Sequence, residues 1–257
     1  MPLSVSSRRP LIAGNWKMNG LRRDGLDRVR ALAARANERG TLGVDIAVFP
    51  PATLLVELRA ALEASPIALG AQDCAITEKG AYTGDIGAPM LADAGCRYVI
   101  LGHSERRHGH GESDETVRRK AEAASAAGLV ALICLGETQA ERAAGQTLEV
   151  LGAELARSLP ERMGDADAVI VYEPVWAIGS GLTPSREEIA EAQGFVRQRL
   201  SGRDPGLGER MRLLYGGSVT PSNAAEFMAI TDVDGLLVGG ASLDSADFWA
   251  ICEASGA

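Results

Sequence analysis

The sequence has few aromatic residues and few cysteines. Phe, Trp and Tyr make up 4% of its 257 residues, so the aromatic platforms on which many sugar-binding sites stack their ligands are scarce. The four cysteines, Cys74, Cys96, Cys134 and Cys252, lie far apart and form no C-x-x-C pair. This spacing suggests neither a disulfide framework nor a zinc site, and it fits a reducing, cytoplasmic setting.

Long hydrophobic runs and an excess of positive charge are also missing. The longest apolar run, residues 129–135, is far shorter than the roughly 18 residues of a membrane-spanning helix, so no membrane association is expected. Arg8 and Arg9 resemble a twin-arginine signal, but the apolar stretch after them stops at Asn15, and we expect no signal peptide. The net charge of −8 argues against a nucleic-acid partner. A small anionic ligand is compatible with it, because backbone N–H groups and one Lys can form a local site.

Eight short runs rich in Val, Ile and Leu recur along the chain. They lie at residues 11–14, 44–49, 67–71, 98–101, 130–135, 168–172, 212–215 and 235–238. Segments with helical spacing lie between them, for example 53–62, 115–127 and 187–200. Nearly continuous apolar strands that alternate with helices are typical of a parallel sheet covered by helices. The pattern predicts an α/β fold, a single-domain (β/α)8 barrel with a parallel eight-stranded core.

The chain shows no internal boundary between domains. We take residues 1–9 as an N-terminal extension and residues 10–257 as the barrel domain, because no linker divides the chain. The Gly- and Pro-containing stretch 202–208 is predicted to be a loop before the seventh strand. An open, doubly wound sheet is the alternative fold, but the glycines at 179–181 lack the final Gly of a dinucleotide-binding turn.

Polar residues and glycine pairs directly follow most of the predicted strands. The loops after the carboxyl ends of barrel strands open on one face, so these residues are expected to meet at one mouth. They are Asn15, Lys17, His103, Glu105, Glu137, Glu173, Ser218 and the glycine pairs 216–217 and 239–240. A Lys there is costly unless it meets an anion, and the glycine pairs leave backbone N–H groups open to a phosphate. The sequence therefore predicts a phosphate-binding site.

The segment 172–181, YEPVWAIGSG, places apolar residues after a carboxylate. Val175, Trp176 and Ile178 would be exposed in this segment unless it closes over a ligand and expels water. We expect the segment to act as a lid.

Three other functions fit parts of this pattern. Glu105, Glu137 and Glu173 could supply the two carboxylates of a glycosidase, but Lys17 and the glycine pairs would then have no role. His103 and Glu105 fit the H-x-E of a zinc deaminase, whose P-C-x-x-C partner the sequence lacks. A non-catalytic scaffold on the same barrel would be expected to have lost Glu173, His103 or Lys17, and all three are present.

Six motifs occur in the order and on the loops of one known family. They are GNWKMN at 14–19, GAYTG at 80–84, GHSERR at 102–107, YEPVWAIGSG at 172–181, YGGSV at 215–219 and VGGAS at 238–242. Through them the sequence resembles the triosephosphate isomerases from about residue 11 to residue 248. The resemblance implies an isomerase of glycolysis and gluconeogenesis that interconverts D-glyceraldehyde 3-phosphate and dihydroxyacetone phosphate through an enediolate. An isomerase of a four-carbon ketose phosphate such as erythrulose phosphate is the alternative.

The resemblance also implies roles for individual residues. Glu173 matches the base that moves the proton, and His103 matches a neutral electrophile that polarises the carbonyl. A position just before a helix is expected to depress the pKa of His103. Lys17 and Asn15 match groups that stabilise the enediolate oxygen and the phosphate. The phosphate-binding positions of the family match Gly179, Ser218, Gly239 and Gly240.

Five further residues match supporting positions of the family. Glu105 matches a partner of the catalytic cation, and Cys134 matches a buried residue behind the base. Tyr215 matches the latch of the closed lid, and Trp176 belongs to the lid itself. Thr83 matches the loop that enters the site of a neighbouring subunit, which implies a homodimer. No cofactor and no metal is implied.

Two features depart from the family pattern. Leu182, Thr183 and Pro184 change the second hinge of the lid, where the opening rate could differ without a change of reaction. His108 and His110 form an isolated H-x-H pair, which we take as loop residues because further metal ligands are missing from the sequence around them.

Overall fold

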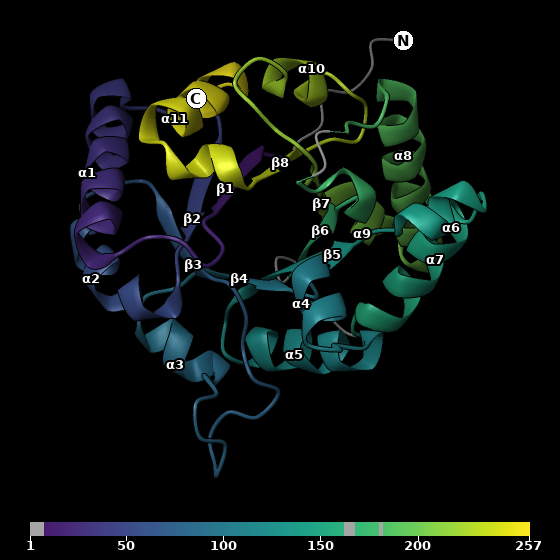
Figure 1. Cartoon of the computed structure of the whole chain (residues 1–257), viewed down its shortest axis with the longest axis horizontal. Helices are drawn as coiled ribbons and strands as arrows, with labels where there is room; N and C mark the ends of the chain where they lie inside the picture. Colours follow the sequence, from purple (N-terminus) through teal and green to yellow (C-terminus); the bar gives the residue numbers. More distant parts are fainter. Residues whose placement is uncertain (1–7, 162–167, 180–181) are drawn as a thin grey trace.

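The computed structural model describes residues 8–161, 168–179 and 182–257. Eight parallel strands form a closed barrel in which each strand pairs with the next along the chain and β8 pairs with β1 (Figure 1). The strands are β1 (Leu11–Asn15), β2 (Asp45–Phe49), β3 (Ala68–Ala71), β4 (Tyr98–Leu101), β5 (Val130–Leu135), β6 (Ala168–Tyr172), β7 (Arg212–Tyr215) and β8 (Gly235–Val238). The predicted (β/α)8 barrel is confirmed.

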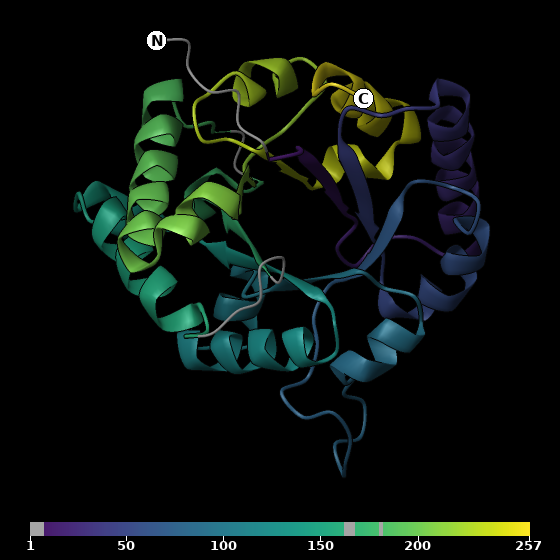
Figure 2. The ribbon, with the colours of Figure 1, turned by 180° about the vertical axis from the view of Figure 1, so that it is seen from behind.

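Helices surround the barrel on its outside (Figures 1 and 2). The α-helices are α1 (Arg22–Arg39), α2 (Leu55–Ala61), α3 (Ala88–Asp93), α4 (Ser104–Gly109), α5 (Asp114–Ala126), α6 (Gln139–Ala143), α7 (Thr147–Ser158), α8 (Arg186–Arg203), α9 (Pro205–Arg210), α10 (Ala224–Met228) and α11 (Ser245–Ala254). Short 3-10 helices are η1 (Ala52–Leu54), η2 (Val175–Ala177) and η3 (Gly240–Leu243). In the described part of the chain, none of the helices is long and apolar enough to cross a membrane.

The predicted strands agree with the observed ones to within one residue at each end. The predicted loop at 202–208 was wrong, because α8 continues to Arg203 and α9 begins at Pro205. The Asp204 carboxylate accepts the N–H of Gly206 at 2.8 Å, and Pro is favoured at the first position of a helix. These two local signals start a new helix where composition alone had indicated a loop.

Apolar side chains form two separate clusters, one on each side of the barrel wall. The larger cluster joins the strands to the surrounding helices. The smaller one takes alternate residues of the strands, so it fills the interior of the barrel. Its buried members are Leu11, Ala13, Ala47, Phe49, Tyr98, Ile100, Leu132, Cys134, Val169, Val171, Leu214 and Leu237. Among the residues that the structure describes, side chains therefore fill the interior of the barrel below its mouth, which leaves the loops after the strands as the place for a ligand.

Two segments lie outside this regular pattern. The loop between β3 and α3 projects from the molecule beside α3, and residues 78–85 in it are all exposed (Figures 1 and 2). Of the predicted extension, Arg8 and Arg9 are described, and they form ion pairs with Asp234 at 2.9 Å and with Asp45 at 2.7 Å. Residues 1–7 lie outside the described part of the chain.

Candidate active site at the mouth of the barrel

A cavity of about 360 Å³ lies at the carboxyl ends of the strands. All eight residues predicted to be catalytic or phosphate-binding line it: Asn15, Lys17, His103, Glu173, Gly179, Ser218, Gly239 and Gly240. Five other predicted residues, all within the described part of the chain, lie outside its lining: Thr83, Glu105, Cys134, Trp176 and Tyr215.

His103 and Glu173 are buried side by side in this cavity. His103 Nε2 lies 2.8 Å from Glu173 Oε1, and the N–H of Ser104 donates to Glu173 Oε2 at 3.1 Å. The N–H of Glu105 donates to His103 Nδ1 at 3.2 Å. Because Nδ1 is an acceptor, the proton of the neutral ring is on Nε2, from which it is donated to Glu173.

This contact changes the pKa of both groups. Burial by itself lowers the pKa of His103, but attraction to the Glu173 carboxylate and the hydrogen bond with it outweigh burial and raise the pKa. Burial would raise the pKa of Glu173, and the interaction with His103 holds it below its ordinary value. The predicted depression of the His103 pKa was therefore wrong for this arrangement, because it considered the following helix and not the carboxylate contributed by β6.

Lys17 is held at the mouth by both its side chain and its backbone. Its Nζ lies 2.6 Å from Glu105 Oε1, and its N–H donates to Asn15 Oδ1 at 3.0 Å. Its backbone has a φ of 52°, a left-handed conformation that costs of order 1 kcal/mol for a residue other than Gly. Gln72 donates to the Lys17 carbonyl at 2.7 Å and so fixes this conformation. Gln72 was not among the residues predicted from the sequence, although it directly follows β3 as the other site residues follow their strands.

The glycines at the mouth have two different structural roles. A Cβ added to Gly240 would meet no atom within 4 Å, and one added to Gly239 would lie 3.7 Å from Lys17 Cε, an ordinary contact. Packing therefore does not require glycine at either position. A Cβ added to Gly217 would lie 2.0 Å from the Tyr215 hydroxyl, so glycine is required there.

The predicted lid packs against two neighbouring loops. Trp176 Nε1 donates to Glu137 Oε1 at 2.8 Å, and Ser218 Oγ donates to the Ala177 carbonyl at 3.0 Å. Val175, Trp176 and Ile178 are half-buried rather than exposed. Ser180 and Gly181 of this segment lie outside the described residues.

Glu137 does not lie at the mouth, contrary to the sequence-based expectation. Its side chain is 1% exposed and accepts hydrogen bonds from Trp176 and from the Tyr172 hydroxyl, the latter at 3.3 Å. Burial raises the pKa of Glu137, although the hydrogen bonds from Trp176 and Tyr172 oppose the shift. The glycosidase alternative thereby loses one of its three candidate carboxylates.

Cys134 and Tyr215 are buried beneath the mouth. Burial and the nearby Glu173 charge raise the pKa of the Cys134 thiol well above its ordinary value. The Tyr215 hydroxyl is buried, and within the part of the chain that the structure describes it has no hydrogen-bond partner. An unpaired buried hydroxyl costs about 1–3 kcal/mol. A movement of the surrounding loops that gave the Tyr215 hydroxyl a hydrogen-bond partner would therefore be favourable.

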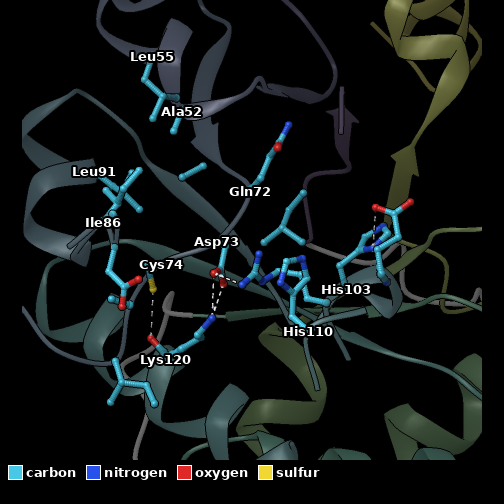
Figure 3. A pocket seen from close by; sticks show the side chains of 18 of the residues that line it. Ala52, Leu55, Gln72, Asp73, Cys74, Ile86, Leu91, His103, His110 and Lys120 are labelled. Atoms are coloured by element: carbon cyan, nitrogen blue, oxygen red, sulfur yellow. Dashed lines mark hydrogen bonds and ion pairs between the residues drawn. The ribbon is translucent and has the colours of Figure 1, made fainter. Parts of the chain in front are cut away.

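A second cavity, of about 700 Å³, adjoins the first and shares Asn15, Lys17 and His103 with it. Figure 3 shows Leu91 on one side of this cavity, His103 on the other, and the Lys120–Asp73 ion pair, of 2.7 Å, between them. The projecting loop contributes Tyr82, Gly84 and Asp85 to its lining, whereas Thr83 of the same loop is exposed and lies outside the lining.

Comparisons with known proteins agree with this geometry. The family model described as triosephosphate isomerase matches residues 10–255. A triosephosphate isomerase of Afipia carboxidovorans is 55% identical over 96% of this chain and 97% of its own length. One of Ruegeria pomeroyi is 54% identical over 96% of this chain and 97% of its own. A crystal structure of triosephosphate isomerase from Bartonella henselae superposes with a TM-score of 0.88 at 45% identity, covering 96% of this chain and 98% of that one. The chain therefore belongs to the triosephosphate isomerase family and is an enzyme that interconverts triose phosphates.

Proposed function

We propose that Glu173 and His103 carry out the proton transfers of this isomerisation through an enediolate intermediate. Glu173 would remove the proton from the carbon next to the carbonyl and return it to the neighbouring carbon. His103 would donate its Nε2 proton to the carbonyl oxygen. The observation that carries the proposal is the 2.8 Å contact between Nε2 and the carboxylate within the cavity.

The contact between His103 and Glu173 would itself take part in substrate binding. One Nε2 proton cannot serve both the carboxylate and a substrate oxygen, so a carbonyl that takes this proton releases Glu173 towards the carbon. Release of Glu173 also removes the carboxylate that raises the pKa of His103, which then reacts as a neutral imidazole. Substrate binding would in this way prepare both the base and the electrophile.

We propose that Lys17 and Asn15 stabilise the negative charge that develops on the oxygen. Lys17 lies 2.6 Å from Glu105, so its cation is already positioned before a ligand arrives. The phosphate would lie against Gly179, Ser218, Gly239 and Gly240. Support comes from the open space at Gly239 and Gly240, where packing does not explain the glycines but a closely approaching ligand would.

The experiment that tests the mechanism is turnover of D-glyceraldehyde 3-phosphate by the purified protein. The same assay is run with the Glu173→Gln variant, and wild type is also assayed with a four-carbon ketose phosphate as substrate. Rapid, Glu173-dependent conversion of the triose supports the proposal. Turnover of the four-carbon substrate alone would keep the mechanism and change the substrate, whereas an active Glu173→Gln variant would refute the mechanism.

We further propose that the chain acts as a homodimer in which the projecting loop of one copy enters the second cavity of the other. Residues 78–85 are exposed along their whole length, and the side chain of Tyr82 is 55% exposed. Met18, beside Lys17 and in the lining of that cavity, is 96% exposed, which is costly for a large apolar side chain in water. A second copy would cover both surfaces.

We also propose that the protein is located in the cytoplasm. Cys74, Cys96, Cys134 and Cys252 are all buried and free, which is compatible with a compartment in which thiols stay reduced.

A further inference from the structure

Arg142 lies at the end of α6, a short helix whose start is firmly fixed. The Thr138 side chain accepts the N–H of Glu141 at 3.3 Å, and the Glu141 carboxylate accepts the N–H of Thr138 at 2.7 Å. This reciprocal capping box sets the direction of the helix. The Arg142 side chain therefore projects from a fixed base.

The guanidinium group of Arg142 contacts the first turn of the predicted lid. Its Cζ lies 3.5 Å from the centroid of the Trp176 ring, the distance of direct stacking. Glu137 accepts a hydrogen bond from the edge of the same ring at 2.8 Å. Trp176 is thus bound on its face by a cation and at its edge by a carboxylate.

The same guanidinium also contacts the segment that follows the lid. Arg142 Nη2 donates to Glu188 Oε1, while Glu188 Oε2 accepts the N–H of Ser185 at 2.7 Å. Ser185 caps α8 directly after the altered hinge at residues 182–184. Arg142 therefore joins the two ends of the lid to each other.

We propose that Arg142 is a positioning residue that holds the lid in the arrangement described here, in which Trp176 rests on Glu137. This inference rests on the proposed ligand site and on the lid expected from the sequence, since it needs the segment around Trp176 to move when a ligand binds. Closure that displaces Trp176 must break the stacking contact. The contact therefore lowers the affinity for ligands that require closure and speeds their release.

The stacking contact contributes more than the ion pair. The side chains of Arg142 and Glu188 are 30% and 42% exposed, and a pair this open to solvent is weakened by water and salt. The Arg142 Cζ lies over the indole at 3.5 Å from its centroid, and one guanidinium nitrogen, Nη1, is buried with no hydrogen-bond partner among the described residues. Arg142→Leu should thus have a larger effect than loss of the Glu188 charge.

The test measures the binding and release of 2-phosphoglycolate, whose carboxylate resembles a planar enediolate. Arg142→Leu removes both contacts, Arg142→Lys keeps the charge but not the plane, and Glu188→Gln removes the ion pair while Gln still forms a capping box. Arg118→Leu is the matched control, because Arg118 forms comparable ion pairs with Glu115 and Glu122 on α5.

The expected result is that Arg142→Leu lowers both the Kd and the release rate of 2-phosphoglycolate by about 3- to 10-fold. Arg142→Lys and Glu188→Gln should show smaller changes in the same direction, and Arg118→Leu should match wild type. An unchanged or weaker affinity in Arg142→Leu, whatever happens to its Tm, would overturn the proposal. If that variant does not fold, wild-type binding by both Arg142→Lys and Glu188→Gln would overturn it.

A separate measurement tests whether the lid moves at all, independently of the role of Arg142. The emission of Trp176, taken as the difference between wild type and Trp176→Phe, should change when 2-phosphoglycolate binds. A wild-type protein whose Trp176 emission does not respond would refute the moving lid, and the role of Arg142 with it. A wild-type response together with unaltered binding in the Arg142 variants would refute the role of Arg142 alone.

Discussion

The imidazole of His103 donates its Nε2 proton to the carboxylate of Glu173 across 2.8 Å, and the two side chains are 5% and 4% exposed. They come from the loops after β4 and β6, two strands that pair on either side of β5, so the pairing of strands far apart in the sequence brings them together. Each group holds the pKa of the other in the direction that favours the charged form. The resting site thus keeps its proposed base ionised and hydrogen-bonded until a ligand competes for the same proton.

Replacement of Glu173 by Gln should abolish most of the turnover. The amide keeps the size of the side chain and can still accept the N–H of Ser104, but it cannot take a proton from carbon. We expect kcat to fall by about 10³- to 10⁴-fold, while the Kd of inorganic phosphate changes little. Glu122→Gln, an exposed change on α5, is the control, and a loss of phosphate binding equal to the loss of kcat would count against the assignment.

Glu154 should make the stability of the fold depend on pH near neutrality. Burial raises the pKa of this carboxyl from 4.5 to about 7. The folded chain therefore holds a proton that the unfolded chain releases, so stability decreases as pH rises from about 4.5 to about 7. Glu154→Gln should remove this decrease and exceed wild type at pH 8 by roughly 2–3 kcal/mol, since one pKa unit corresponds to about 1.4 kcal/mol.

Urea unfolding at pH 5, 6, 7 and 8 measures this effect. The Gln side chain can still accept the N–H of Gly136, which Glu154 accepts at 2.9 Å, so the local geometry is retained. Glu149→Gln, on the exposed face of the same helix, is the control. Parallel pH profiles for wild type and Glu154→Gln would show that the group titrates at its ordinary pKa.

Tyr215→Phe should weaken ligand binding without lowering the stability of the unliganded protein. The hydroxyl is buried without a partner among the described residues, so its removal should leave the unliganded protein as stable as wild type or up to about 2 kcal/mol more stable. If the hydroxyl latches the closed lid, the same change should weaken 2-phosphoglycolate binding by about 5-fold. Thermal unfolding and calorimetric titration measure the two effects, and unaltered affinity would eliminate the latch.

Arg197 should be among the most important residues for stability at the base of the barrel. Its side chain, 12% exposed, pairs with Asp232 at 3.0 Å and Asp234 at 2.5 Å and donates to the carbonyls of Gly208 and Met211. Arg197→Met removes the donor that these acceptors share, although Asp234 keeps its contacts with Arg8 and with the N–H of Leu213, and it should cost about 3 kcal/mol in urea unfolding. Arg118→Met, which breaks only solvent-exposed pairs, should change the free energy of unfolding far less.

Thr83→Arg should produce monomers with poor activity. A long cation on the exposed loop would not fit a cavity whose lining already contains Arg106, Arg119 and Lys120. Analytical ultracentrifugation and turnover at matched concentrations measure the outcome, with Ala225→Arg on the exposed side of α10 as the control. A fully active monomer would refute the proposed contribution of the second copy.

The sequence was sufficient to predict the strands and the residues that line the cavity. Apolar runs mark strands buried on both faces, and in a parallel barrel every polar residue after a strand lies at the same end. This rule correctly placed Lys17, His103 and Glu173 in one cavity, and it would have found Gln72 as well. It was wrong for Glu137, which follows β5 but turns away to bind Trp176.

The sequence by itself therefore determined the barrel, its mouth and the chemical groups gathered there, because these depend on periodicity and on residues next to strand ends. Only the tertiary structure decided which of these groups touch. The raised pKa of His103, the unpaired hydroxyl of Tyr215 and the stacking of Arg142 on Trp176 all arise between segments far apart in the chain. Such contacts depend on how loops from different strands pack, and no local pattern specifies that packing.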